Sequence, residues 1–198
     1  MNSFLLLGII IWIYLLSVVR RARLTAFSFL VGSVGCFFVL MTLSTPYWVW
    51  FFTHGVIDGV AIVEKLIKMG SVYPKYGWIY ITNQATPVTL QIDYECSGII
   101  ETMAYMSLLL FYPTYSRKEK FFYSILGLVW IYLANVVRLI IVVAMVYLGG
   151  ADVFYLAHSI LGRLVFYLLI IVLYYNVFTY SHWAQEFYKL FKKKVRSV

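Results

Sequence analysis

Charged residues are scarce in this chain. Only 12% of its 198 residues are Asp, Glu, Lys or Arg, whereas 63% are hydrophobic. A water-soluble domain needs more polar surface than this, so the composition excludes an ordinary soluble protein and predicts a membrane protein. Acidic residues are fewer than basic ones, 8 against 16. Most of the basic residues lie in short clusters beside apolar runs. That distribution suits anionic membrane lipid and argues against nucleic acid as a partner.

Cysteine is nearly absent, since Cys36 and Cys96 are the two that occur. Cys36 lies inside the apolar run 27–43, and Cys96 lies at the edge of another apolar run. We therefore expect no structural disulfide. Cys36 has no polar neighbour in its span, so we interpret it as a small packing residue.

Five apolar segments approach the roughly 20 residues that cross about 30 Å of hydrocarbon. The first of them lacks a preceding basic segment and is followed by arginines, so we interpret it as a retained span rather than a signal peptide. The sequence thus predicts an all-α polytopic membrane protein with five transmembrane helices, forming one integral membrane domain over 1–198. The predicted spans are 4–19, 26–45, 97–112, 121–148 and 157–180.

Basic clusters follow the first, third and fifth predicted spans. Because basic loops stay on the cytoplasmic side, we expect an external N-terminus, a cytoplasmic C-terminus and a multi-pass protein of the cell membrane. The segments 46–95 and 149–156 are then external. The clusters are Arg20, Arg21 and Arg23; Arg117, Lys118 and Lys120; and Lys189, Lys192, Lys193, Lys194 and Arg196.

The external segment 46–95 is predicted to hold a helix and a hairpin. Residues 47–70 are aromatic at first and amphipathic later, which favours a helix in the outer membrane interface, with a sixth buried helix as the open alternative. Residues 78–82 and 88–94 are rich in β-branched and aromatic side chains, and the turn-like sequence NQATP separates them. They predict a small external β-hairpin that leads the chain to Cys96.

Ionisable side chains inside hydrocarbon cost about 2.5 to 3.5 kcal/mol on insertion scales, so their presence there suggests function. Four occur within the predicted spans: Glu101, Arg138, His158 and Arg163. In the predicted orientation, Cys96, Arg138 and His158 all fall in the outer leaflet. Residues 96–180 would then form a catalytic transmembrane core.

Cys96 is the candidate nucleophile. A helix start and cationic neighbours favour the reactive thiolate, and Ser97 and Gly98 leave room for a substrate backbone. Glu95 would oppose the thiolate unless it faces away. The alternative is that Cys96 is a small buried packing residue.

His158 and Arg138 are the candidate partners of that thiol. A histidine can accept the thiol proton and return it to a leaving amine, although an interfacial histidine can also simply bond a carbonyl. The Arg138 guanidinium can hold an oxyanion or a substrate carbonyl or carboxylate, and Asn135, on the same helical face, can orient it or add a donor. The alternative pairs Arg138 with Glu101 to join helices.

Arg163 competes with His158 for the place beside the Cys96 thiol. It lies five residues beyond His158, about 7.5 Å along an α-helix and about 140° around it, so we expect only one of the two to reach the thiol. Arg163 could equally pair with Glu101 or Asp152. We predict neither a metal nor another cofactor, because Cys96 and His158 are too few ligands for a closed zinc site. His54 and His182 are interpreted as interface residues.

Three short motifs resemble the exosortase/archaeosortase family. They are ECSGI at 95–99, NVVR at 135–138 and AHSILGR at 157–163. Members of that family are integral membrane enzymes with a Cys, Arg and His or Arg triad, regarded as cysteine transpeptidases that act on C-terminal sorting signals of exported proteins. The resemblance covers about 90–170 and implies Cys96, Arg138 and His158 as the triad. With few predicted spans and no appended soluble domain expected, the chain resembles the compact members of this family that occur in Gram-positive bacteria.

These observations predict a membrane-embedded cysteine peptidase or transpeptidase on the outer face. Its partner would be the C-terminal signal peptide of an exported protein, and an amine acceptor or water would resolve a thioester. The rival from another class is a non-catalytic membrane factor for export or assembly of polysaccharide or surface protein, with Arg138 and Glu101 structural. A small transporter fits less well, because no internal repeat is evident.

Overall fold

The computed structural model describes residues 3–44, 47–67, 69–81, 87–92 and 96–179. Glu95, His182, the basic cluster 189–196 and most of the predicted turn lie outside the described residues. The chain forms two compact units, one from 1–45 and 100–127 and the other from 46–99 and 128–198.

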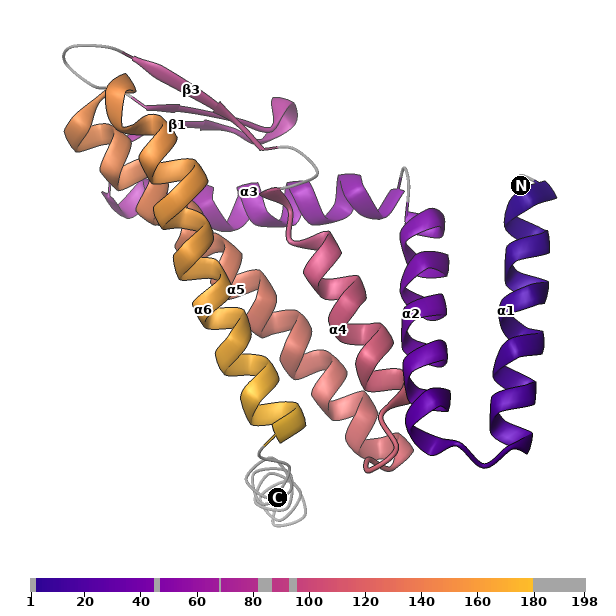
Figure 1. The fold of residues 1–198 in the computed structure, drawn as a ribbon. Helices are drawn as coiled ribbons and strands as arrows, with labels where there is room; N and C mark the ends of the chain where they lie inside the picture. The colour runs from indigo at the N-terminus through magenta and orange to yellow at the C-terminus, as the bar shows by residue number, and fades with distance from the viewer. Residues whose placement is uncertain (1–2, 45–46, 68, 82–86, 93–95, 180–198) are drawn as a thin grey trace, which may run out of the picture. The chain divides into compact units, whose positions relative to one another are not determined.

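In the first unit, α1 (Ser3–Arg21) and α2 (Thr25–Ser44) form a helical hairpin (Figure 1). The Trp12 indole N–H donates a hydrogen bond of 2.8 Å to the Val31 carbonyl. Gly35 lies against the same indole, where a Cβ would overlap the ring. The missing side chain at Gly35 is therefore what allows α2 to accept a tryptophan from α1.

The first unit also contains α4 (Ile99–Phe111), apart from its first residue, and the beginning of α5 (Arg117–Gly149). Ser116 and Glu119 start α5 with a reciprocal capping box: Ser116 N donates to Glu119 Oε2 at 2.8 Å, and Glu119 N donates to Ser116 Oγ at 3.4 Å. The Tyr105 hydroxyl donates to the Tyr123 carbonyl at 2.8 Å, which ties α4 to α5.

A three-stranded antiparallel sheet belongs to the second unit, in the order β1 (Gly70–Tyr73), β2 (Trp78–Ile81) and β3 (Val88–Gln91). Strands β2 and β3 pair with Ile79 opposite Leu90, so the predicted hairpin is confirmed within the described residues. The first strand was not predicted, because four residues ending before a proline carry too little alternation to be recognised.

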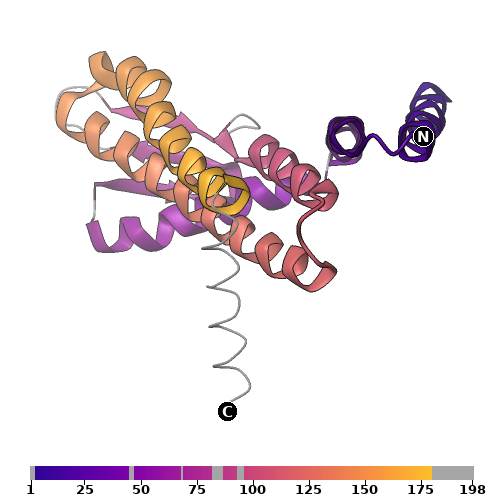
Figure 2. The same ribbon diagram turned by 60° about the horizontal axis from the view of Figure 1, so that its bottom comes forward.

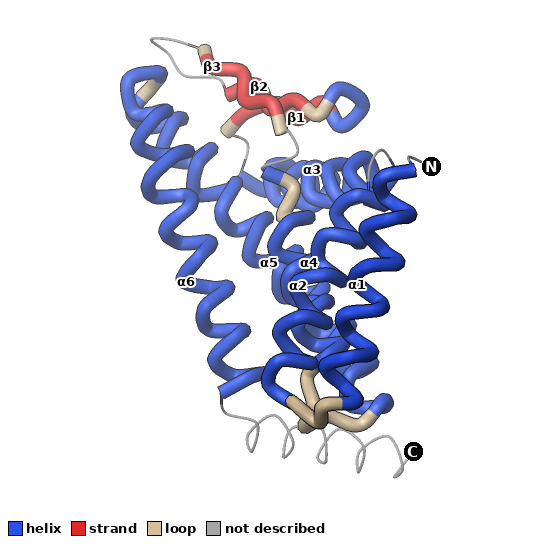
Figure 3. The backbone as a smooth tube through the Cα atoms, turned by 45° about the vertical axis from the view of Figure 1, so that its right-hand side comes forward, coloured by secondary structure: helices blue, strands red, loops and turns tan. Residues whose placement is uncertain are grey.

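The sheet lies over α3 (Tyr47–Ile67), as Figure 1 and Figure 3 show. Buried side chains from the sheet, α3 and the C-terminal half of α5 form one apolar core, and Cys96 belongs to it. The periodicity of 2 in the strands and 3.6 in the helix brings these residues onto facing surfaces. The core residues are Val56, Ile57, Val60, Ile79, Ile81, Leu90, Ile92, Cys96, Val136, Leu139, Val142, Val143, Val146 and Ala157.

Beyond Gly150 the chain returns along α5 as a composite helix. It contains a 3₁₀ turn (Ala151–Val153), a π-helical segment (Leu156–Leu161), α6 (Gly162–Tyr174) and a second π-helical segment (Tyr175–Thr179). Figure 1 and Figure 2 both show α6 beside α5. The Trp130 indole donates to the Leu169 carbonyl at 2.9 Å across this pair.

Three helical segments of the described chain are long and apolar enough to cross a membrane: Thr25–Ser44, Arg117–Gly149 and Ala151–Thr179. Helix α4 has 13 residues and extends only about 20 Å at 1.5 Å per residue. Neither α1 nor α3 is among the three. The membrane character of the fold is therefore supported, whereas the predicted count of five spans, or six, is not confirmed.

Candidate active site

Cys96 lies between the sheet and α4, three residues before the helix begins at Ile99. Its side chain is only 4% exposed. Gly98 has a φ of +73°, a left-handed conformation that side chains disfavour. A Cβ there would lie 3.3 Å from Asn135 Nδ2. Gly98 thus provides both the turn that presents Cys96 and the close approach of that turn to α5.

His158 approaches the thiol from the returning helix. Its Nε2 lies 3.6 Å from Cys96 Sγ, within hydrogen-bond reach for sulfur. His158 belongs to the π-helical segment, and such segments are frequent at functional sites. Phe154 stacks on the imidazole, with ring centroids 5.6 Å apart and an interplanar angle of 3°. The stacking holds the ring plane while its edge faces the sulfur.

Arg138 approaches the same sulfur from α5. Its Nη2 donates to Cys96 Sγ at 3.7 Å, and its guanidinium carbon lies 5.7 Å from the centroid of the Phe166 ring. The residue is 3% exposed, and its buried Nε has no hydrogen-bond partner among the described residues. A Cβ at Gly162 would lie 2.8 Å from Val142 Cγ2 and 2.9 Å from the Ala157 carbonyl oxygen. The missing side chain at Gly162 therefore allows the returning helix to pack closely against α5, next to Arg138.

Asn135 holds the main chain of Cys96. Its Nδ2 donates to the Cys96 carbonyl at 2.7 Å, and the residue is fully buried. The sequence suggested that Asn135 orients the Arg138 guanidinium or adds a donor, but the hydrogen bond found here goes to the backbone of Cys96. Its Oδ1 is buried and has no partner among the described residues.

The remaining predicted residues occupy different places. Ser97 is buried, and its Oγ accepts a hydrogen bond of 3.4 Å from Ile99 N at the start of α4. Arg163 is exposed on α6. Cys36 is buried in α2, within the other unit, and both cysteines are thiols. His54 stacks on Trp50, and its Nδ1 lies 2.9 Å from the Trp50 carbonyl.

Sequence reasoning missed three residues in this region. Phe154 and Phe166 support the imidazole and the guanidinium, and the signal for Phe154 was its position four residues before His158. Glu64 lies in the segment 47–70, whose amphipathic pattern gives no signal for this particular acid. It is 8% exposed on the core side of α3, and its Oε1 has no partner among the described residues.

The arrangement combines three chemical capacities around one sulfur atom. A positive charge beside a thiol favours its nucleophilic form, an imidazole at its side can carry a proton, and a buried guanidinium can stabilise a developing anion. Within the described residues no group of three or more His, Cys, Asp or Glu side chains is placed to hold a metal ion. Comparison of the chain with models of known protein families, with curated proteins and with solved structures gave no significant match.

Proposed function

We propose that this protein is a membrane-embedded cysteine peptidase or transpeptidase of the exosortase type. One observation carries the proposal: Cys96 Sγ lies 3.6 Å from His158 Nε2 and 3.7 Å from Arg138 Nη2. If Cys96 were only a packing residue, nothing would require a buried guanidinium from α5 and an imidazole from the π-helical segment to contact its thiol. The motif resemblance around the same three residues supports this reading independently of the distances.

In the acylation step, Cys96 Sγ attacks the carbonyl carbon of the scissile peptide bond. His158 accepts the thiol proton, and Arg138 donates hydrogen bonds to the oxyanion that forms. The C–N bond then breaks, and His158 returns the proton to the leaving amine. The product is a thioester between Cys96 and the new carboxyl end of the substrate.

In the second step, an amine acceptor or water attacks the thioester carbonyl. His158 takes the proton of the attacking group and passes it to the Cys96 sulfur as the C–S bond breaks. An amine yields a transferred chain, and water yields simple cleavage. The substrate class that fits is the C-terminal sorting signal of an exported protein, because such a signal presents its peptide bond at the membrane where Cys96 lies.

The proposal includes a location. The N-terminus and the site lie on the outer side of the cell membrane and the C-terminus lies in the cytoplasm, since 11 of the 16 basic residues then face the cytoplasm. Reporter fusions at both termini test this arrangement. A reporter at residue 198 that is active only outside the cell would contradict it.

The decisive experiment is to trap the thioester. Membranes from cells that make the full chain are quenched in acid, and the Cys96 peptide is analysed by mass spectrometry with and without hydroxylamine, which cleaves thioesters. We expect an adduct on Cys96 that hydroxylamine releases, and its mass identifies the substrate. The Cys36→Ala variant should keep the adduct.

The rival reading makes the opposite prediction for the same measurement. A non-catalytic membrane factor would leave Cys96 unmodified under every condition. If cells that make the full chain still process membrane-anchored export substrates but show no adduct on Cys96, the proposed enzyme is ruled out.

A further inference from the structure

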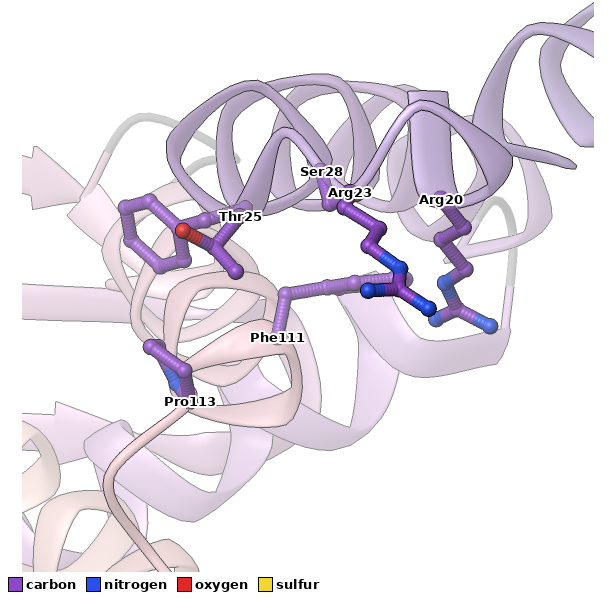
Figure 4. A pocket seen from close by; sticks show the side chains of 7 residues that line it. Arg20, Arg23, Thr25, Ser28, Phe111 and Pro113 are labelled. Carbon is purple, nitrogen blue, oxygen red and sulfur yellow. The ribbon is translucent and has the colours of Figure 1, made fainter. Parts of the chain in front are cut away.

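A cavity with a basic wall lies in the first unit, whereas Cys96 belongs to the second. It has a volume of about 290 Å³. Its polar wall comes from Arg20, Arg23, Thr25 and Ser28, and its apolar wall from Phe29, Phe111 and Pro113. Figure 4 shows the Arg20 and Arg23 side chains extending toward the same side, with Thr25 further along the cavity. We call this the Arg20/Arg23 cavity.

The two guanidinium groups are uncompensated. Neither forms an ion pair with an acidic side chain among the described residues, and Glu119, in the first turn of α5, accepts a hydrogen bond from Ser116 N. Two like charges beside one cavity repel each other unless an anion lies between them. Guanidinium groups bind phosphate through paired donors, and the hydroxyls of Thr25 and Ser28 can add further donors.

Arg23 has a backbone conformation that is energetically unfavourable for a residue with a side chain. Arg23 N donates to Arg20 O at 3.1 Å, and Leu24 N donates to Val19 O at 3.3 Å, which is the Schellman ending of a helix. The left-handed residue of that motif is usually glycine, but here it is Arg23, with a φ of +55°. A glycine at position 23 would relieve the backbone, so the arginine is explained better by its side chain than by the turn.

A second hollow lies along α1 and also has Arg20 in its lining. It has a volume of about 380 Å³, shares Arg20, and is lined by Ile13, Leu16, Ser17 and Arg21. A charged group at Arg20 with an apolar extension over Ile13 and Leu16 matches a phosphate that carries an acyl chain. The first cavity, near the lower end of the size range for ligand sites, suits a small headgroup.

We propose that the Arg20/Arg23 cavity binds a phosphate group, and that a membrane phospholipid is its source. The function is independent of the Cys96 site, which lies in the other unit. A soluble phosphate ester shares the same recognition chemistry, and the experiment below separates the two sources.

The test uses the full chain, stripped of lipid in an uncharged detergent. Phosphatidylglycerol is compared with diacylglycerol, which has the same acyl chains but no phosphate, and with inorganic phosphate and glycerol 3-phosphate. Native mass spectrometry measures bound lipid, and the rise in Tm measures binding of all four probes. We expect phosphatidylglycerol to bind and diacylglycerol not to bind.

Two variants make the test specific. Arg23→Gly removes a guanidinium while relieving the backbone, so it should fold with an equal or higher Tm and bind phosphatidylglycerol about tenfold more weakly. Lys118→Gln removes an exposed charge of the same unit that does not line the cavity, and its affinity should change less than about twofold.

Each outcome decides the proposal. Glycerol 3-phosphate or inorganic phosphate could bind more tightly than phosphatidylglycerol and be equally sensitive to Arg23→Gly. That result would support the phosphate site but show that its ligand is a soluble phosphate and not a phospholipid. Unchanged binding in Arg23→Gly, or equal losses in Arg23→Gly and Lys118→Gln, would overturn it.

Discussion

Asn135 donates a 2.7 Å hydrogen bond to the main-chain carbonyl of Cys96, a residue 39 positions earlier in the chain. Arg138, three residues after Asn135 on the same face of α5, donates to the Cys96 sulfur. One turn of α5 therefore holds both the backbone and the thiol of the candidate nucleophile. The positions of Asn135 and Arg138 are coupled through that helix.

We first expect Asn135→Ala to destabilise the protein by about 1–3 kcal/mol, because it removes a buried hydrogen bond to the Cys96 carbonyl. Asn176→Ala is the matched control, since Asn176 Nδ2 donates to the Val172 carbonyl at the same 2.7 Å but is exposed. Chemical or thermal unfolding in detergent measures both. Equal stability losses in the two variants would contradict the role assigned to Asn135.

The second prediction separates the two cysteines. Cys96→Ala should abolish processing of an exported substrate without lowering protein abundance, because the partners of the proposed nucleophile surround Cys96. Cys36→Ala should leave processing intact, since Cys36 lies in the other unit. Immunoblots of substrate length and of protein level read out both effects. Full activity in Cys96→Ala would favour a non-catalytic membrane factor.

Arg138→Lys is the third test. Lysine keeps the charge but loses the planar fork, so we expect a folded protein whose turnover falls by roughly a hundredfold or more, as when an oxyanion donor is removed. Arg163→Lys makes the same change at an exposed position of α6 and should remain near normal. Near-normal turnover in Arg138→Lys would show that only the positive charge of Arg138 matters, and not the geometry of its guanidinium.

A fourth prediction concerns the proton carrier. His158→Ala should slow acylation drastically, and its residual rate should rise with pH as more of the thiol ionises unaided. Arg163→Ala should change stability or substrate positioning but leave the pH profile of the remaining activity unaltered. Processing rates against pH, normalised to folded protein, test this. An inactive Arg163→Ala beside a normal His158→Ala would replace His158 by Arg163 in the triad.

Gly98 provides the fifth test, with Gly77 as its control. Both have φ near +70°, so alanine at either position should cost about 1–2 kcal/mol of strain. Only at Gly98 would the new Cβ press on Asn135 Nδ2, at 3.3 Å, whereas at Gly77 its nearest neighbour, at 3.5 Å, is Ile92 O. We expect similar stability losses but a loss of processing in Gly98→Ala alone. Comparable activity in the two variants would show that the turn at Gly98 does not position Cys96.

Much of the fold was predictable from the sequence because its signals are local. The scarcity of charge indicated a membrane protein, and alternation in 88–92 indicated the strand whose Leu90 is buried. The first strand and the two π-helical segments left no such signal, since four to six residues carry too little periodicity. The number of membrane spans, inferred from run length alone, is the part of the predicted fold that the structure does not confirm.

The sequence by itself determined which side chains have the chemistry to act: one thiol beside a flexible Ser-Gly pair, and Arg138, His158 and Arg163 in apolar surroundings. Their catalytic roles remain predictions. Only the tertiary structure decided that His158 and Arg138 meet the sulfur of Cys96 and that Asn135 bonds its carbonyl rather than the guanidinium. The reason is physical: these contacts join residues 39, 42 and 62 positions apart, and their geometry depends on how α5, the π-helical segment and the Gly98 turn pack, which no local pattern encodes.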